Sequence, residues 1–230
     1  NSPMFRSILQ IFFPSTCLSC GKSITEDDQM FCATCAIQIA MTDFDNPAEN
    51  EMARRLAPIR NLQYAVAPFY YKADSPIQQL LFKIKYQDRS DLAKKIGVFF
   101  AGYIQEKLSD KAIDIITCVP LHRDKLKLRG YNQSEILASA ISELNGIPFL
   151  NCLKRLRLTE TQTHFGRMAR LENQSDSIQC TEEIKNYGHV LLVDDVLTTG
   201  ATVETCCDAL RGKNPTIAIS IATLCMADHW

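Results

Sequence analysis

The 230-residue sequence has no long apolar run, no internal repeat and no low-complexity segment. No stretch reaches the ~18–20 apolar residues that a membrane-spanning helix needs. The apolar segment nearest the start, Met4–Phe13, contains Arg6 and Gln10 and lacks the small-residue cleavage site of a secretory signal peptide. Hydrophobic residues make up 46% and charged residues 22% of the chain, which excludes a disordered or collagen-like protein. We therefore expect a globular, cytoplasmic protein without a membrane span.

An excess of either charge is also missing from the chain as a whole. The sequence has 25 basic and 26 acidic residues and a net charge of −1, which argues against a simple nucleic-acid binder. The two signs are nevertheless unevenly distributed. Residues 120–170 contain nine Lys and Arg against four acidic residues, whereas residues 171–230 contain three against nine. Such charge runs are most often solvated faces. The alternative is that the basic segment lines an anion-binding site.

Cysteine, in contrast, is abundant, with ten residues in the chain. Four of them form two C-x2-C pairs separated by eleven residues: Cys17, Cys20, Cys32 and Cys35. This spacing can bring four thiolates to one tetrahedral Zn²⁺. A disulfide framework is the alternative, but it is typical of secreted chains. Four cysteine ligands would close the site to water and substrate, so we expect a structural zinc rather than a catalytic one. The other six cysteines lack ligand spacing, and we expect them to be small buried residues.

From residue 63 onward, strand-like apolar runs alternate with helical patterns. The expected strands are Tyr64–Tyr71, Ile113–Val119, Val190–Val193 and Thr216–Leu224. The expected helices are one opened by Ser75-Pro76, then Asp88–Leu108, Asn132–Leu144 and Ala201–Leu210. This alternation predicts an α/β fold with a mainly parallel sheet and helices on both faces. We expect residues 1–60 to form an N-terminal helix, the zinc module and a connector, and residues 61–230 to form the α/β domain.

The segment His189–Thr202 (HVLLVDDVLTTGAT) carries the strongest chemical signal. Four apolar residues are followed by the carboxylate pair Asp194-Asp195 and then by a loop rich in hydroxyl groups, which leads directly into a helix. In open α/β sheets, ligands bind beyond the carboxyl ends of the strands. The helix start, the Thr hydroxyls and a glycine that lets the backbone approach closely would form a phosphate cradle. Vicinal hydroxyls would bind the carboxylates, so we infer a ribose 5-phosphate ligand. The alternative is an ordinary βα turn with a helix cap.

The segment Val190–Thr202 resembles the signature with which type I phosphoribosyltransferases bind phosphoribosyl pyrophosphate (PRPP). Other motifs, in the same order, resemble the ComF family of competence proteins. These motifs are the cysteine pairs, Lys85-Tyr86, Val119–His122, Arg129–Gln133, Arg157 with Thr159 and Gln162, and Arg170 with Asn173. The chain departs from the family at Cys118, where a proline is usual, and at Phe165-Gly166, where Leu-Ser is more frequent. The first departure could alter the loop after the strand at Ile113.

The resemblance implies a type I phosphoribosyltransferase-like domain behind an N-terminal zinc ribbon. It also implies transfer of phosphoribosyl from PRPP, with Mg²⁺, to an unidentified nitrogen acceptor, with release of pyrophosphate. The implied catalytic residues are Asp194 and Asp195. The implied phosphate-binding residues are Val196, Thr198, Thr199, Gly200, Ala201 and Thr202. The implied pyrophosphate and flap residues are Leu121, His122, Arg123, Arg129, Arg167 and Arg170. Supporting roles are implied for Lys85, Asn132, Gln133 and Gln162. Arg167 and Arg170 share one helix face, and whether they clamp an anion or face solvent stays open.

A second function is compatible with the same residues. The ComF resemblance implies a role in DNA uptake and natural transformation, together with other DNA-uptake proteins. The basic segment and the zinc module would then contact single-stranded DNA, and the fold would be used without turnover. Because binding through several phosphates weakens steeply with salt, salt dependence distinguishes this function from binding of PRPP alone. The two functions are also compatible with each other.

Overall fold

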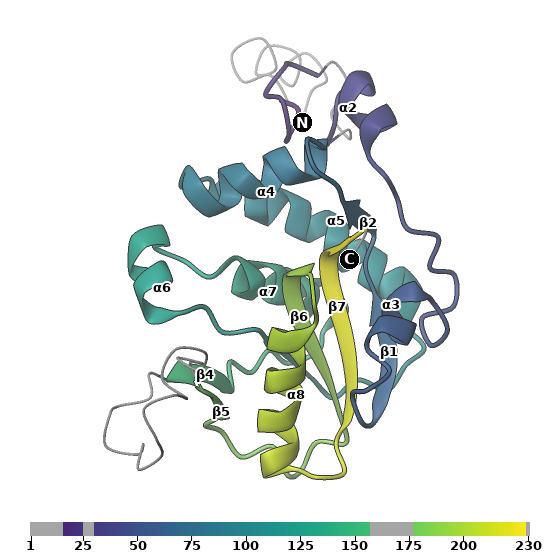
Figure 1. The fold of residues 1–230 in the computed structure, drawn as a ribbon, viewed down its shortest axis with the longest axis vertical. Coiled ribbons are helices and arrows are strands. Elements are labelled where there is room, and N and C mark those ends of the chain that lie inside the picture. The colour runs from purple at the N-terminus through teal and green to yellow at the C-terminus, as the bar shows by residue number, and fades with distance from the viewer. Residues whose placement is uncertain (1–15, 25–29, 157–176, 229–230) are drawn as a thin grey trace, which may run out of the picture.

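The computed structural model describes residues 16–24, 30–156 and 177–228. Its centre is a five-stranded sheet with the order β1-β7-β6-β3, in which β2 also pairs with β7 (Figure 1). All the pairings in this sheet are parallel. The strands are β1 (Leu62–Val66), β2 (Phe69–Tyr71), β3 (Ile115–Cys118), β6 (His189–Leu197) and β7 (Ala218–Ala227). A separate antiparallel pair is formed by β4 (Leu153–Leu156) and β5 (Ser177–Cys180).

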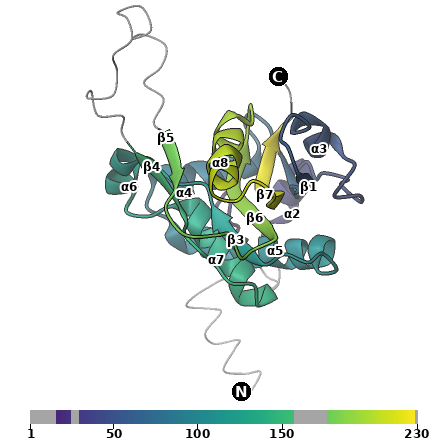
Figure 2. The same cartoon turned by 90° about the horizontal axis from the view of Figure 1, so that it is seen from below.

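Helices cover both faces of the central sheet, which confirms the predicted α/β class (Figure 2). One apolar cluster joins the sheet to α4 (Pro76–Tyr86), α5 (Ser90–Leu108) and α7 (Gln133–Asn145). The cluster on the other face joins it to α3 (Glu51–Arg55) and α8 (Ala201–Lys213). Two shorter helices are α2 (Ala33–Gln38) and α6 (Arg123–Arg129). Among the described residues, no helix is long and apolar enough to cross a membrane.

The central strand β6 illustrates why the sheet is buried on both sides. Leu191 and Val193 belong to the first apolar cluster, whereas Val190 and Leu192 belong to the second. Successive side chains of a strand point to opposite faces, so a continuous apolar run is what a doubly covered parallel strand requires. The six cysteines outside the C-x2-C pairs are all buried, as expected of small apolar side chains.

Several element boundaries follow from local signals. Ser75 caps α4 by accepting a hydrogen bond from the Gln78 backbone N–H at 3.2 Å, and Pro76 occupies the first helical position. Asn132 caps α7 in the same way through the Ser134 N–H. One boundary differs from the prediction in a way that matters for function: β6 does not end at Val193 but continues to Leu197 through both aspartates.

Candidate functional site

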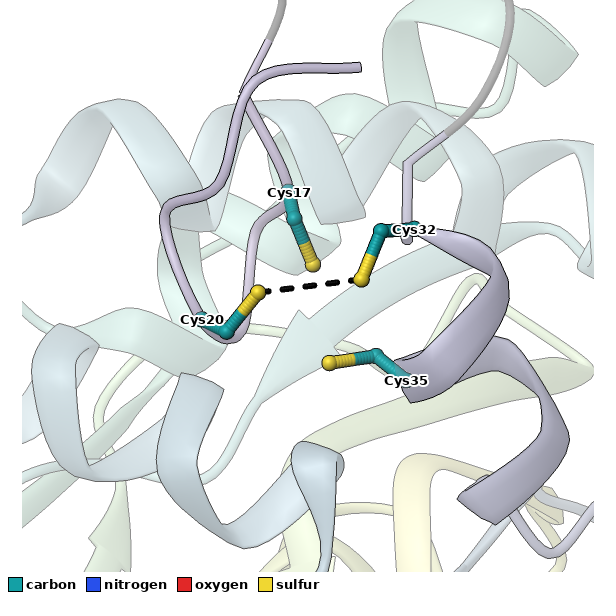
Figure 3. Close-up of side chains that lie close together, drawn as sticks. All are labelled: Cys17, Cys20, Cys32 and Cys35. Carbon is teal, nitrogen blue, oxygen red and sulfur yellow. Dashed lines mark hydrogen bonds between the residues drawn. The ribbon is translucent and has the colours of Figure 1, made fainter.

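The four cysteines of the C-x2-C pairs converge on one point, although eleven residues separate the two pairs (Figure 3). The first pair lies on a tight hairpin, in which Gly21 has a φ of 78° and donates its N–H to the Cys17 carbonyl at 2.9 Å. Only glycine adopts this backbone conformation without strain. The second pair spans the start of α2, where Cys32 is the N-cap residue. All four Sγ atoms lie within 4.8 Å of one another.

The donor set and its dimensions fit a tetrahedral metal ion. With Zn–S bonds of ~2.3 Å, neighbouring sulfurs of a tetrahedral site lie about 3.8 Å apart. The Sγ atoms of Cys20 and Cys32 lie 3.7 Å apart. Burial raises the pKa of Cys17, but backbone hydrogen bonds from Cys32, Cys20 and Ser19 outweigh it and lower the pKa to about 6. These hydrogen bonds favour the thiolate, the form that binds metal, at Cys17, whereas burial raises the pKa of Cys35 to about 12. The cluster can hold a metal ion.

The two aspartates of the predicted motif lie within β6 and not beyond its end. Asp194 is in register with Thr223 of β7, and Val196 is in register with Cys225. The two carboxylates have different partners, although both partners come from helices that pack on the same face of the sheet. Asp195 is turned toward α4, whereas Asp194 contacts the start of α7.

Asp195 is buried and paired with a lysine from α4. Its Oδ2 atom lies 2.6 Å from Lys85 Nζ and has no hydrogen-bond partner of good geometry among the described residues. Burial alone would lower the pKa of Lys85, but the carboxylate of Asp195 outweighs this effect and raises it. Lys85 therefore places a positive charge directly against the buried Oδ2 atom of Asp195.

Asp194 is partly exposed and is held by α7. Its Oδ1 atom accepts hydrogen bonds from Ser134 Oγ at 2.8 Å and from the Asp195 backbone N–H at 2.9 Å. Burial first, and then the charge of Asp195, raise the pKa of Asp194 to about 7, although Ser134 acts in the opposite direction. This carboxyl group therefore titrates near neutral pH.

The loop after β6 turns sharply into α8. Gly200 is the N-cap of α8 with a φ of 84°, and it has no side chain to make a capping hydrogen bond. Thr199 Oγ1 accepts the Ala201 N–H at 3.3 Å. Thr198 and Thr199 are exposed, and Thr202 is partly exposed. The open start of a thirteen-residue helix, with hydroxyl groups beside it, has the donors and the dipole that favour a phosphate group.

The loop after β3 and the helix α6 carry the predicted basic residues. The Val119 N–H donates to the Val193 carbonyl at 2.9 Å, and the Val119 carbonyl accepts from Asn132 Nδ2 at 3.0 Å, so the loop is fixed beside the aspartate pair. Leu121 and His122 are partly exposed. His122 is the N-cap of α6, and its Nδ1 accepts the Asp124 N–H at 3.1 Å. None of the residues of α6 is buried, so Arg123 is free to face solvent or a ligand.

Arg129 ends α6 and connects three elements. Its Nε donates to the Lys85 carbonyl at 2.9 Å, its NH1 donates to Gln133 Oε1, and its guanidinium group lies 5.8 Å from the centre of the Tyr86 ring. Both Arg129 and Gln133 therefore support the helices that carry the aspartate partners. Three other predicted residues, Gln162, Arg167 and Arg170, lie outside the described residues.

Sequence reasoning missed Ser134, which donates to Asp194 from a position 60 residues away. It sits at the second position of α7 and is 1% exposed. The available signal was a run of three polar residues, Asn132, Gln133 and Ser134, at a helix start. The structure buries all three. Polar side chains are buried when they have a partner, but the sequence does not reveal which one.

Comparison with known proteins agrees with this geometry. The model of the phosphoribosyl transferase domain family matches residues 134–229. The DNA utilization protein YhgH of Salmonella typhi is 27% identical over 157 residues, which cover 65% of this chain and 67% of the relative. Competence protein F of Haemophilus influenzae is 36% identical over 104 residues, 44% of this chain and 45% of the relative. Among solved structures, the glutamine PRPP amidotransferase of B. subtilis, complexed with ADP and GMP, aligns with a TM-score of 0.41. That alignment has 19% identity and covers 62% of this chain and 30% of the other.

The parallel sheet with its aspartate-to-threonine loop is therefore a phosphoribosyltransferase-type α/β domain. With the four-cysteine cluster in front of that domain, the chain is similar to the ComF/YhgH proteins.

Proposed function

We propose that this chain binds PRPP and transfers its phosphoribosyl group to a nitrogen acceptor, with release of pyrophosphate. The observation that carries the proposal is the continuous path from the aspartate pair of β6, through the Gly200 turn, to the start of α8, where the N-cap residue has no side chain. The aspartates at the beginning of this path accept hydrogen bonds. A few residues later, the hydroxyl and N–H groups at its end can donate hydrogen bonds to an anion. A ribose 5-phosphate presents the complementary order, with hydroxyl groups at one end and a phosphate at the other.

In this proposal, Asp194 and Asp195 accept hydrogen bonds from the ribose hydroxyls, and Lys85 holds the Asp195 carboxylate in place through the ion pair. The hydroxyl groups of Thr198, Thr199 and Thr202 and the first N–H groups of α8 hold the 5-phosphate. Val196 lies just before this loop, and Ala201 lies at its end, where α8 begins. The loop at Leu121 and His122, with Arg123, faces the pyrophosphate, whose oxygens match a guanidinium group. Arg167, Arg170 and Gln162 would complete the site from the flap.

Mg²⁺ would neutralise the charge of the departing pyrophosphate. The protein offers it few free ligands, because Asp195 is paired with Lys85 and Asp194 has a pKa of about 7. The residues therefore fit an ion held mainly by the diphosphate and by water, as is usual for Mg²⁺. The protein's own contribution is to orient the ribose and to stabilise the leaving group through positive charges and N–H donors that are in position before the reaction begins.

We also propose that the metal of the four-cysteine cluster is zinc and that its role is structural. Four sulfur ligands favour Zn²⁺ among common divalent ions and leave no open position. Residues 1–60 would then form a zinc-ribbon module and connector in front of the phosphoribosyltransferase-like domain of residues 61–230.

Binding of PRPP with Mg²⁺, measured by calorimetry, tests the proposal. The wild type should bind, and the double variant Asp194→Asn/Asp195→Asn should lose binding because amides cannot replace both charged acceptors. Asp110→Asn is the matched control, since Asp110 is an exposed acid that pairs with Lys111 shortly before β3, far from the loop after β6. Equal binding by the wild type and the double variant would overturn the assignment of the ribose ligands.

A second candidate function is binding of single-stranded DNA, and a specific surface favours it. Phe82 and Tyr86 are exposed on α4 with ring centres 5.1 Å apart, and Arg129 lies over Tyr86. The solvent-facing α6, which ends at Arg129, also carries Lys125 and Lys127. Aromatic faces flanked by cations are typical of surfaces that bind single strands. The names of the relatives from Salmonella typhi and Haemophilus influenzae, which refer to DNA utilization and competence, point the same way.

Salt dependence of oligonucleotide binding tests this second function. Each phosphate contact should contribute a slope of about −0.7 to a plot of log affinity against log salt concentration. Phe82→Ala should weaken binding by the stacking energy of one base, about 1–3 kcal/mol, and should leave the affinity for PRPP unchanged. A flat salt profile would exclude the function.

A further inference from the structure

The hairpin that carries Cys17 and Cys20 is attached to α4 by polar contacts. Ser19, which lies between the two cysteines, is fully buried. Its hydroxyl group donates to Gln79 Oε1 at 3.1 Å, and its carbonyl accepts a hydrogen bond from Lys83 Nζ. Gln79 and Lys83 are four residues apart and therefore lie on one face of the helix. Figure 1 shows α4 lying between the segment that carries these cysteines and the sheet.

The opposite side of α4 reaches the aspartate pair. Lys85 is two residues beyond Lys83, so its side chain leaves the helix about 200° further round the axis. Its Nζ contacts Asp195 Oδ2 at 2.6 Å. The last turn of α4 is also tied to the end of α6 and the chain that follows it, because the Lys85 carbonyl accepts from Arg129 and the Ile84 carbonyl accepts from Tyr131.

The four-cysteine cluster and the aspartate pair are therefore joined by one rigid element, in which Ile77 and Leu80 pack in the same apolar cluster as Cys17 and Leu18. A cysteine hairpin of this kind is too short and polar to fold without its metal. Without the metal, α4 would lose Ser19 as a partner on one side while Lys85 still has to reach Asp195 on the other.

We propose that Ser19, Gln79 and Lys83 are positioning residues, through which metal binding at the four cysteines places Lys85 on Asp195 and so strengthens ligand binding at the aspartate pair. The proposal rests on the proposed function, since PRPP is the ligand with which it is measured. The coupling is reciprocal by linkage: PRPP must raise the affinity for the metal by the same factor by which the metal raises the affinity for PRPP.

The test measures PRPP affinity, with excess Mg²⁺, in variants that keep their zinc. Lys83→Met should retain one zinc per chain, measured by a colorimetric assay, and should bind PRPP about fivefold to tenfold more weakly. Lys83→Arg can still donate to the Ser19 carbonyl and should recover most of that affinity. Lys95→Met is the matched control on α5, where the lysine is exposed, and should bind PRPP like the wild type. In the wild type, a chelator selective for zinc over magnesium should weaken PRPP binding at least as much as Lys83→Met does.

A second measurement separates the inference from the function on which it rests. In the ligand-free protein, the charge of Lys85 lowers the pKa of Asp194, so displacement of Lys85 should move the carbon-13 NMR titration of Asp194 to higher pH in Lys83→Met. If Lys83→Met keeps wild-type PRPP affinity and an unchanged Asp194 titration, the coupling is wrong while the function stands. If the wild type does not bind PRPP but the titration responds to Lys83→Met, the function is wrong while the coupling stands.

Discussion

At Asp194, opposing effects act on a single carboxyl group. Burial, followed by the charge of Asp195, raises the pKa to about 7, while Ser134 and Lys85 act to lower it. Because the pKa in the folded state is above the ordinary value of 3.8, the protonated form is the stabilised one. The contribution of this group to stability is therefore fully present below pH 3.8 and is lost as the pH rises through 7. At neutral pH, a ligand that donates a hydrogen bond to Asp194 relieves part of this cost.

Replacement of the Ser134 hydroxyl tests this account. A hydrogen bond to a charged group contributes about 1.5–3 kcal/mol, and one pH unit corresponds to about 1.4 kcal/mol. Ser134→Ala should therefore raise the pKa of Asp194 by about one pH unit, as followed by carbon-13 NMR. The pH below which PRPP binding weakens should rise by the same amount. Ser139→Ala, at a partly exposed position of the same helix, should change neither quantity. An unchanged titration in Ser134→Ala would show that the hydroxyl does not stabilise the charged form.

His189 lies at the other end of β6 and has a structural role. Its Nδ1 lies 2.9 Å from the Ala112 carbonyl and its Nε2 lies 2.8 Å from Ser220 Oγ. A carbonyl can only accept, so Nδ1 carries the proton and Nε2 accepts from the serine. Burial lowers the pKa of His189 below its ordinary value of 6.5, although the Ala112 carbonyl acts in the opposite direction.

The pH dependence of unfolding should reveal this histidine. A histidine with a lowered pKa in the folded state contributes stability that is fully present above pH 6.5, the unfolded value, and is lost as the pH falls below it. Urea unfolding between pH 8 and pH 5 should therefore show a smaller loss of stability in His189→Gln than in the wild type. Asp194 changes the stability in the opposite direction, but it is present in both proteins. Its effect therefore cancels when the pH profile of His189→Gln is subtracted from that of the wild type. Parallel pH profiles would contradict the assignment.

At the scale of elements, local capping signals predicted where two helices start, but not where β6 ends. Ser75-Pro76 and Asn132 marked the starts of α4 and α7, because capping depends on residues adjacent in sequence. The end of β6 was predicted four residues too early, since its own apolar run stops at Val193. The strand continues because β7 offers a partner as far as Met226, opposite Leu197. A contact between strands that are distant in the chain cannot be predicted from the sequence of either strand alone.

The same distinction applies to the site. The aspartate pair, the threonine loop and Gly200 are contiguous, so their pattern was visible in the sequence. The contacts of Lys85 with Asp195 and of Ser134 with Asp194 join residues that are far apart in the chain. The family resemblance pointed to Lys85 but not to its partner. Which charges and donors surround the carboxylates therefore depends on how α4 and α7 pack on the sheet.

The turn between β6 and α8 should depend on its glycine. Gly200 has a φ of 84°, and a Cβ atom there would lie 3.1 Å from Leu56 Cδ2. Gly200→Ala should therefore destabilise the protein by about 1–2 kcal/mol and weaken PRPP binding. Gly102→Ala is the matched control, because this glycine lies inside α5 with no atom within 4 Å of the added Cβ. Urea unfolding should show that this second variant is stabilised by about 0.5–1 kcal/mol. Equal stability of the two variants would show that the turn tolerates a side chain.

At the scale of the whole molecule, the residues before the proposed domain boundary near residue 60 contribute to both apolar clusters. Cys17 and Leu18 belong to the cluster with α4, and Met52 and Leu56 belong to the cluster with α8. Leu56 also packs under the Gly200 turn. The proposed zinc module and connector are therefore attached to the α/β domain through buried apolar side chains, and shared burial of this kind favours cooperative unfolding.

Cooperative unfolding predicts that zinc release and loss of the sheet occur together. In a thermal scan, a zinc-sensitive dye and far-ultraviolet circular dichroism should give the same midpoint for the wild type. Leu56→Ala removes a side chain that is 3% exposed and should cost about 2–5 kcal/mol, so it should lower both midpoints by the same amount. Ile37→Ala on α2 is the control, because Ile37 is 86% exposed and its loss should change stability by less than about 0.5 kcal/mol. Leu56→Ala could instead lower only the midpoint of the circular dichroism signal while zinc stays bound. The four-cysteine cluster would then keep its metal after the sheet has melted, which would show that the residues before the boundary fold independently of the α/β domain.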